Sequence, residues 1–266
     1  MITGNLFSSS SPPTSVRNVR DHVAVARMAL GQGDYHASLR NLNCALYHLE
    51  NCKGDFSTGE LAEMEHLAGK VYIQLRMYKE AERALQNAIN LHCGPEFSAI
   101  DVIADSRHLA ECFRLSHKLE EAETLYKQCV ADLKKLKGAE VQLGKAYMGI
   151  AQVLIDAKKP QEADDAIRSA LNIFEFNGGI KGYWYGRCLM TLARLRFSQG
   201  NLSAAEDILS HALEIIQPLI GPQHPLRARA LRALSDLSVR NGKTQDCQDF
   251  LSRAQAIENF LKDHDR

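Results

Sequence analysis

The sequence has no long apolar run and no excess of either charge. No stretch approaches the roughly 18 consecutive apolar residues of a membrane-spanning helix, which excludes an α-helical integral membrane protein. Its 32 Lys and Arg residues balance its 32 Asp and Glu residues, so a protein that acts through bulk positive charge is excluded. The seven cysteines form no CxxC pair, which disfavours a disulfide framework and a zinc ribbon.

The N-terminal segment lacks the features of a targeting signal. It has no basic stretch followed by a long apolar stretch, and position 2 is not glycine, so neither a secretory signal nor myristoylation is expected. Four serines at 8–11 precede Pro12 and Pro13, a composition that cannot bury a core. We expect a mobile tail over residues 1–16, one domain over residues 17–266, and a cytoplasmic protein.

Catalytic signatures are also missing. The chain contains no P-loop, GxGxxG, GxSxG or HExxH motif. The acidic pair Glu120–Glu121 falls in the first turn of a predicted helix, where carboxylates interact favourably with the helix dipole. His92 and Cys93 are adjacent and so point in different directions on a helix. We therefore expect no enzymatic activity, no metal and no cofactor.

A repeat of about 42 residues runs through the rest of the chain. Six similar segments align, with successive spacings of 43, 41, 41, 42 and 42 residues, on these register positions: Tyr35, Tyr78, Leu119, Pro160, Leu202 and Thr244. In each segment a small residue follows three positions later, a large one after four more, and a small one again after three more. In the second segment these are Ala81, Leu85 and Ala88. This spacing predicts an amphipathic helix that packs closely against another.

A second helix is predicted upstream of each register position, separated from it by a short turn. Gly33, Gly200 and Gly242 are suited to end the upstream helix in the left-handed conformation, and Pro160 is suited to open a helix. No sustained two-residue alternation is present, so strands are not expected. The pattern predicts six antiparallel helix pairs stacked side by side.

These marks resemble the tetratricopeptide repeat (TPR) family. The resemblance rests on small and aromatic positions such as Ala68, Gly69 and Tyr72 on the first helix of the second unit, and on their equivalents over about 240 residues. It implies an all-α fold, a right-handed superhelical solenoid of about six antiparallel helix pairs. The period near 42 and the stretch of residues 221–225 (GPQHP) resemble the longer-period, kinesin-light-chain-like type. The paired asparagines of that type are replaced, for example by Met148 and Gly149, and the carboxylate clamp of chaperone-binding members is not matched either.

In this family the first helix of each pair lines a concave groove. Positions 2, 5, 9 and 12 of that helix share one face. Of the 24 residues at these positions, ten are basic and three acidic, whereas the first turns of the second helices hold 13 acidic and 6 basic residues. We therefore predict a basic groove and a more acidic outer wall. The candidate partner-binding residues are His66, Lys70, Arg107, Glu111, Arg114, Lys145, Met148, Gln152, Arg187, Met190, Arg194, Phe197, Arg229 and Arg232.

Some of these side chains have a second interpretation. Met148, Met190 and Phe197 could contact a peptide or pack between helices. Trp184, within the aromatic cluster at 183–185, could cover the neighbouring repeat or anchor a partner.

The predicted function is that of a non-enzymatic scaffold that binds an extended or helical, acidic segment of another protein. Two alternatives remain open: binding of RNA or single-stranded nucleic acid in the same groove, and a regulator that senses a peptide. The groove has few aromatic residues for base stacking, which favours the protein partner. The sequence does not determine the oligomeric state.

Overall fold

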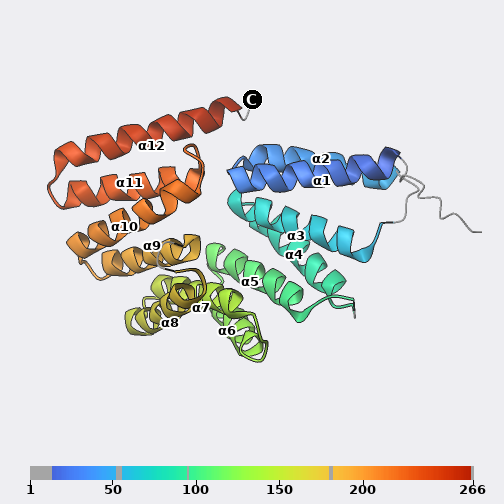
Figure 1. The fold of residues 1–266 in the computed structure, drawn as a ribbon, viewed down its shortest axis with the longest axis horizontal. Coiled ribbons are helices and arrows are strands. Elements are labelled where there is room, and N and C mark those ends of the chain that lie inside the picture. The colour runs from blue at the N-terminus through green and yellow to red at the C-terminus, as the bar shows by residue number, and fades with distance from the viewer. Residues whose placement is uncertain (1–13, 52–55, 95, 180–181, 265–266) are drawn as a thin grey trace, which may run out of the picture.

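The computed structural model describes residues 14–51, 56–94, 96–179 and 182–264, and over these it contains α-helices, one short 3-10 helix and no strand. The elements, in chain order (Figure 1), are α1 (Thr14–Gln32), α2 (Tyr35–Asn51), α3 (Thr58–Gln74), α4 (Tyr78–His92), α5 (Ala99–Leu115), α6 (Leu119–Leu133), α7 (Glu140–Asp156), α8 (Pro160–Gly178), α9 (Tyr183–Ser198), α10 (Leu202–Ile216), η1 (Gln217–Leu219), α11 (Pro225–Arg240) and α12 (Thr244–His264). No helix among the described residues is long and apolar enough to cross a membrane.

The twelve helices form the six antiparallel pairs that the repeat predicts. Each register residue is the first residue of the second helix of its pair, from Tyr35 in α2 to Thr244 in α12. The predicted tail boundary needs correction, because α1 begins at Thr14 and residues 14–16 are helical. Thr and Ser are favoured at helix N-termini, which allows the helix to start before the apolar pattern does. Residues 1–13 lie outside the described part of the chain.

Alternating small and large side chains let the second helix of one pair pack closely against the first helix of the next pair. In the third repeat Ala122 and Cys129 of α6 are buried on either side of Tyr126, which is 2% exposed. The Tyr126 ring lies against Gly149 of α7, and a Cβ added to that glycine would be 2.2 Å from Tyr126 Cε1. Gly149 is therefore needed for close approach, because any larger residue would displace the ring.

Each helix pair turns through one residue with a positive φ. At three of the turns this residue is the expected glycine, with φ between 78° and 85°, and at the other three it is Arg76, His117 or Lys158, with φ between 59° and 65°. Glycine adopts this conformation freely, whereas other residues do so at a cost of about 1–2 kcal/mol. The turn geometry is thus imposed by the packing of the pair, even where the sequence does not favour it.

The first helices of the pairs form the inner layer of the solenoid. Apart from the contact within each pair and with the next element in the chain, α1 contacts α3, α3 contacts α5, α5 contacts α7, and α7 contacts α9. The ribbon shows two of the second helices, α6 and α8, at the lower edge of the molecule (Figure 1). The face shared by α3, α5, α7 and α9 is therefore the inner one.

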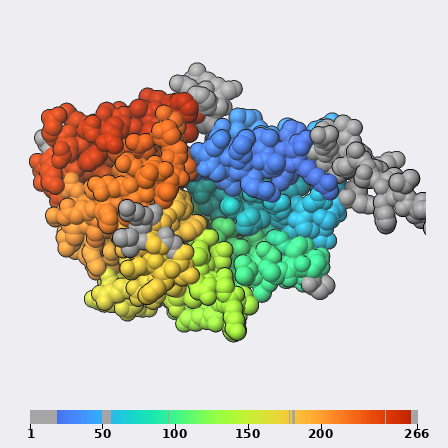
Figure 2. Space-filling view, viewed as in Figure 1, coloured from blue at the N-terminus to red at the C-terminus, as the bar shows by residue number. Residues whose placement is uncertain are grey.

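The two ends of the solenoid meet. Gly33, in the turn between α1 and α2, lies so close to Pro225 at the start of α11 that a Cβ on the glycine would be 2.2 Å from Pro225 Cδ. The space-filling view shows the N-terminal repeat in contact with the C-terminal repeats (Figure 2). The superhelix therefore curves far enough in one turn to bring its first and sixth repeats together.

Candidate binding groove

The inner face encloses a cavity of about 1010 Å³ lined by the first helices of all six pairs. Side chains from α1, α3, α5, α7, α9 and α11 contribute to it, together with Tyr35 at the start of α2 and Tyr126 of α6. Thirteen of the fourteen candidate residues line this cavity, and they are His66, Lys70, Arg107, Glu111, Arg114, Lys145, Met148, Gln152, Arg187, Met190, Arg194, Phe197 and Arg229. The four-position periodicity of the first helices thus identifies residues that share one cavity.

Arg232 is the exception. Its guanidinium forms a bidentate ion pair with Glu258 of α12, and it does not line the cavity. The sequence prediction places it in the groove because it occupies the equivalent helix position. The acid on the outer helix of its own pair attracts it away from the groove, so its place in the groove was predicted wrongly.

Ion pairs between repeats neutralise part of the predicted positive charge. On the N-terminal side, Arg20 pairs with Glu60 and Arg27 pairs with Glu63, both across α1 and α3. These pairs are solvent-exposed and contribute little to stability, but Glu63 offsets the charge of Arg27, which lines the cavity.

A shared acid has the same effect on the other side of the groove. Asp156, the last residue of α7, accepts a hydrogen bond from Arg114 Nη1 at 2.7 Å, and Arg194 Nη2 lies 3.7 Å from its other oxygen. Arg194 also donates to the backbone oxygen of Gln152 at 2.9 Å. These arginines join three successive repeats and hold the inner helices in register.

Five basic residues of the cavity form no ion pair among the described residues. They are Lys70, Arg107, Lys145, Arg187 and Arg229, one from each of the helices α3, α5, α7, α9 and α11. The acidic residues that line the cavity are Glu111 and Asp236. The groove therefore keeps a positive excess after ion pairing, although a smaller one than the helix-face count predicts.

The lysines in the centre of the groove are perturbed by burial and by one another. Burial, followed by the charges of Arg107 and Lys70, lowers the pKa of Lys145 from 10.5 to about 8. Burial and the nearby Arg107 and Arg27 also lower the pKa of Lys70, although Glu111 acts in the opposite direction. Both shifts mean that the groove holds its positive charges in a poorly solvated place.

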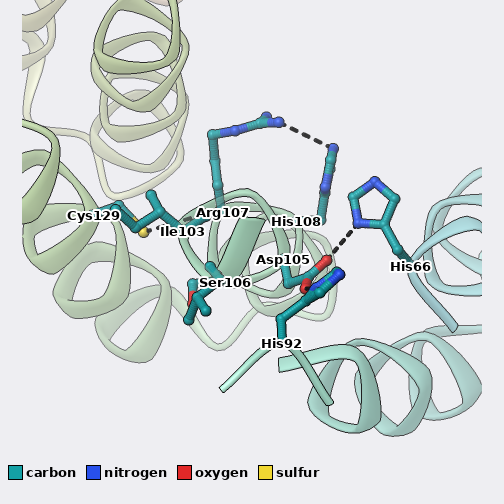
Figure 3. Close-up of polar contacts among 9 residues, drawn as sticks. His66, His92, Ile103, Asp105, Ser106, Arg107, His108 and Cys129 are labelled. Carbon is teal, nitrogen blue, oxygen red and sulfur yellow. Dashed lines mark hydrogen bonds and ion pairs between the residues drawn. The ribbon is translucent and has the colours of Figure 1, made fainter. Parts of the chain in front are cut away.

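The side chain of His108, next to these basic residues, is neutral. Burial, followed by the adjacent Arg107 and other cations, holds the pKa of His108 well below its usual value. Arg107 Nη2 lies 3.2 Å from His108 Nε2 (Figure 3). Because arginine can only donate, Nε2 must accept, and the proton of the neutral ring is on Nδ1. His108 Nδ1 is buried without a hydrogen-bond partner in the described structure.

A buried carboxylate beneath this cluster connects three helices. Asp105 of α5 is fully buried, and its two oxygens lie 2.5 Å from His66 Nδ1 of α3 and 2.6 Å from His92 Nδ1 of α4 (Figure 3). The His66 ring also packs edge-on against His108, with 5.0 Å between centroids. Asp105 is therefore fully engaged by the two histidines, and it fixes His66 at the edge of the cavity.

Aromatic side chains cover another part of the wall. Trp184 of α9 is half-buried, stacks on Phe174 of α8 at 6.4 Å between centroids, and carries Lys145 Nζ 4.2 Å above its ring. Tyr183 packs against Trp184 and accepts a hydrogen bond from Arg187. Trp184 thus covers the neighbouring repeat and also lines the cavity, and its contact with a partner stays a prediction.

The apolar candidates differ in exposure. Met148 is 6% exposed and belongs to the core, whereas Met190 is half-buried and Phe197 is 37% exposed under the guanidinium of Arg240. Met148 thus packs between helices, and Met190 and Phe197 remain accessible from the cavity.

Sequence reasoning missed several cavity residues. Tyr35 belongs to a second helix and reaches the groove only because the solenoid closes. Burial raises the pKa of Tyr35, and the charges of Arg229 and Arg187 lower it by a smaller amount. His108 lies one position beyond the predicted face of α5. His224 precedes α11, in the stretch singled out for its resemblance, and caps that helix through its side chain. The proximity of these residues depends on the superhelical curvature, which the sequence does not reveal.

The tetratricopeptide repeat family model matches residues 142–216 and 184–258. Residues 142–258 are tetratricopeptide repeats. The match covers most of α7 to α12, and the first three pairs follow the same register of about 42 residues. No curated protein matches the chain by sequence.

Solved TPR-like structures share the fold over most of the chain. BtubC (BKLC) from P. vanneervenii is similar, with a TM-score of 0.59 and 15% identity over 94% of this chain and 93% of that chain. The Rap conjugation gene regulator of the plasmid pLS20 in complex with the Phr* peptide gives a TM-score of 0.68 and 12% identity over 96% and 78% of the two chains. A putative kinesin light chain from Podosopora anserina with nearly identical TPR-like repeats gives a TM-score of 0.52 and 20% identity over 77% and 97%. At these identities the likeness establishes the fold, an all-α TPR-like solenoid.

Proposed function

We propose that this protein is a non-enzymatic scaffold that binds an extended or helical segment of a partner protein in the groove. The observation that carries the proposal is the cavity itself, which has about 1010 Å³ of space and is lined by six successive first helices. A groove of this kind suits a peptide, because each repeat presents the same helix face to the next stretch of ligand. A similar structure was solved in complex with a peptide, which supports the same use of this groove.

The partner segment is acidic in this proposal. Lys70, Arg107, Lys145, Arg187 and Arg229 keep their charge unpaired by any described acid, and they extend from α3 to α11. Carboxylates on the ligand would replace the missing counter-charges, and arginine can bind them in a bidentate manner. The cytoplasmic location expected from the sequence belongs to the same proposal.

A double charge reversal tests this function. Arg107→Glu with Arg229→Glu places two negative charges on different helices of the groove, whereas Arg40→Glu with Arg83→Glu makes the same change on exposed outer helices and serves as the control. We expect proteins captured from a cell extract by the wild type to be retained by the control and lost with the groove variant. Equal retention by both variants would overturn the proposal.

Nucleic acid is the other outcome that this design detects. Wild-type protein is titrated with single-stranded RNA at 50 and 200 mM salt. Tight binding that weakens steeply with salt would show that the groove neutralises phosphates of a nucleic acid, and it would replace the protein partner. A peptide-sensing regulator would also change its superhelical curvature on binding, which small-angle scattering with and without the captured segment measures.

A further inference from the structure

Three cations from three successive repeats gather in the middle of the groove. Lys70 of α3, Arg107 of α5 and Lys145 of α7 line the same cavity. Arg107 acts electrostatically on both lysines, and Lys70 acts on Lys145. None of the three forms an ion pair among the described residues, and Glu111 is the carboxylate that acts on Lys70. One carboxylate cannot balance three cations, so this part of the groove carries uncompensated charge.

We propose that Lys70, Arg107 and Lys145 form a subsite for a compact dianionic group on the ligand, either a phosphate monoester or two adjacent carboxylates. The subsite rests on the proposed function, since it specifies which chemical group of the bound segment lies at the centre of the groove. Two lysine ammonium groups and one guanidinium group, each from a different helix, offer several N–H donors, which suits an anion with several acceptor oxygens.

The neighbouring polar groups do not satisfy this charge internally. Asp105 lies next to the cluster, but its two oxygens are already bonded to His66 and His92. His108 accepts a hydrogen bond from Arg107 as a neutral ring, so it orients the guanidinium without cancelling its charge. The nearby carboxylate of Asp105 is therefore paired with histidines, and the three cations remain available to a ligand.

The perturbed lysines agree with a site built for an anion. Burial and mutual repulsion lower the pKa of Lys145 to about 8 and lower the pKa of Lys70. A bound dianion would reverse the repulsion and raise both pKa values. Like charges brought together at this density are expected where a ligand supplies the opposite charge.

The chain contains its own reporter for this subsite. Trp184 is its single tryptophan, and Lys145 Nζ lies 4.2 Å above the ring. When an anion draws the ammonium group away from the indole, the environment of the ring changes. Trp184 fluorescence therefore reports directly on the occupancy of the subsite.

Sulfate is the probe of choice, because it is a dianion throughout the useful pH range. Sulfate is titrated at constant ionic strength, with chloride as the balancing salt. We expect a saturable change in Trp184 fluorescence, weakened at least tenfold in Lys70→Met with Arg107→Gln. The matched control is Lys79→Met with Arg83→Gln on α4, which should bind as the wild type does. Circular dichroism verifies that each variant is folded. A change that does not saturate, or equal affinity in the groove variant, overturns the subsite.

The pH dependence gives a second, independent readout. Sulfate binds the protonated form of Lys145, so affinity should fall as the pH rises through about 8, where this lysine loses its proton. Lys145→Arg keeps the charge at all these pH values, so its affinity should fall less than that of the wild type between pH 7 and pH 9. An affinity of the wild type that is constant over this interval would exclude Lys145 from the subsite.

Peptide pools distinguish the two sources of the dianion. Three random-sequence pools carry a fixed phosphoserine, a fixed Glu-Glu pair or a fixed Ser-Ser pair at the centre. Preferential retention of the first or the second pool supports the subsite and names its ligand, whereas equal retention of all three overturns it. The proposed function fails separately: sulfate binding combined with capture that does not depend on the groove would refute the function alone. Capture that depends on the groove without sulfate binding would refute the subsite alone.

Discussion

Replacement of Asp105 tests whether the polar cluster beneath the groove holds repeats two and three together. The carboxylate is fully buried and accepts from His66 at 2.5 Å and from His92 at 2.6 Å. Hydrogen bonds to a charged group contribute about 2 kcal/mol each, so Asp105→Ala should lower the free energy of unfolding by about 4 kcal/mol.

Asparagine at position 105 provides the matched comparison. Its amide keeps one acceptor and adds a donor, and a neutral histidine can accept through Nδ1, so both hydrogen bonds can persist as neutral ones worth about 1 kcal/mol each. Asp105→Asn should therefore be destabilised by about 2 kcal/mol, half as much as the alanine variant.

Urea denaturation followed by circular dichroism measures both values, and amide hydrogen exchange locates the loss of protection. We expect the increase in exchange to concentrate in α3, α4 and α5, which the carboxylate connects. If both variants lose less than about 1 kcal/mol, or if exchange rises equally in all repeats, then the cluster does not join the two repeats as reasoned.

Two glycines give further predictions. Gly149→Ala should lower the free energy of unfolding by about 1–3 kcal/mol, measured by urea denaturation, because the new Cβ would lie 2.2 Å from the Tyr126 ring in a packed core. Gly33→Ala should separate the first repeat from Pro225 and increase the radius of gyration measured by small-angle scattering. Gly200→Ala has a similar positive φ and open space around it, so it should be destabilised by backbone strain without a change in size. Equal radii for these two variants would show that the ends of the solenoid are not held in contact.

Helix pairing could be predicted from the sequence because its determinants are local. The small, large, small pattern at Ala81, Leu85 and Ala88 recurs in six segments, and each recurrence marks a face that must be buried. The start of each second helix follows from the same register. Three of the turns were recognisable from glycine, but Arg76 and Lys158 adopt the same left-handed conformation without a sequence signal, because packing imposes it.

Most residues that line the groove could be predicted from the sequence, but the net charge that remains after ion pairing could not. Helix periodicity places Lys70, Arg107 and Lys145 on one face, and the structure brings them into one cavity. Ion pairing decides which charges remain, and it depends on distances between repeats. Arg114 meets Asp156, 42 residues further along the chain, because adjacent first helices pack side by side.

Closure of the superhelix was not predictable for a related reason. The small rotation from one repeat to the next accumulates over six repeats, and no single segment encodes it. The contact of Gly33 with Pro225 and the arrival of Tyr35 opposite Arg229 are consequences of that sum.

Site-specific photo-crosslinking tests the central claim, that the partner segment binds inside the groove. A photoreactive amino acid replaces Met190, which lines the cavity, or Lys79, which is exposed on the outer helix α4. After exposure to a cell extract and illumination, crosslinks to a partner protein should form from position 190 and not from position 79, and the attached peptide should be acidic. Crosslinks that form from position 79 and are absent from position 190 would place the binding surface on the outer wall and contradict the account.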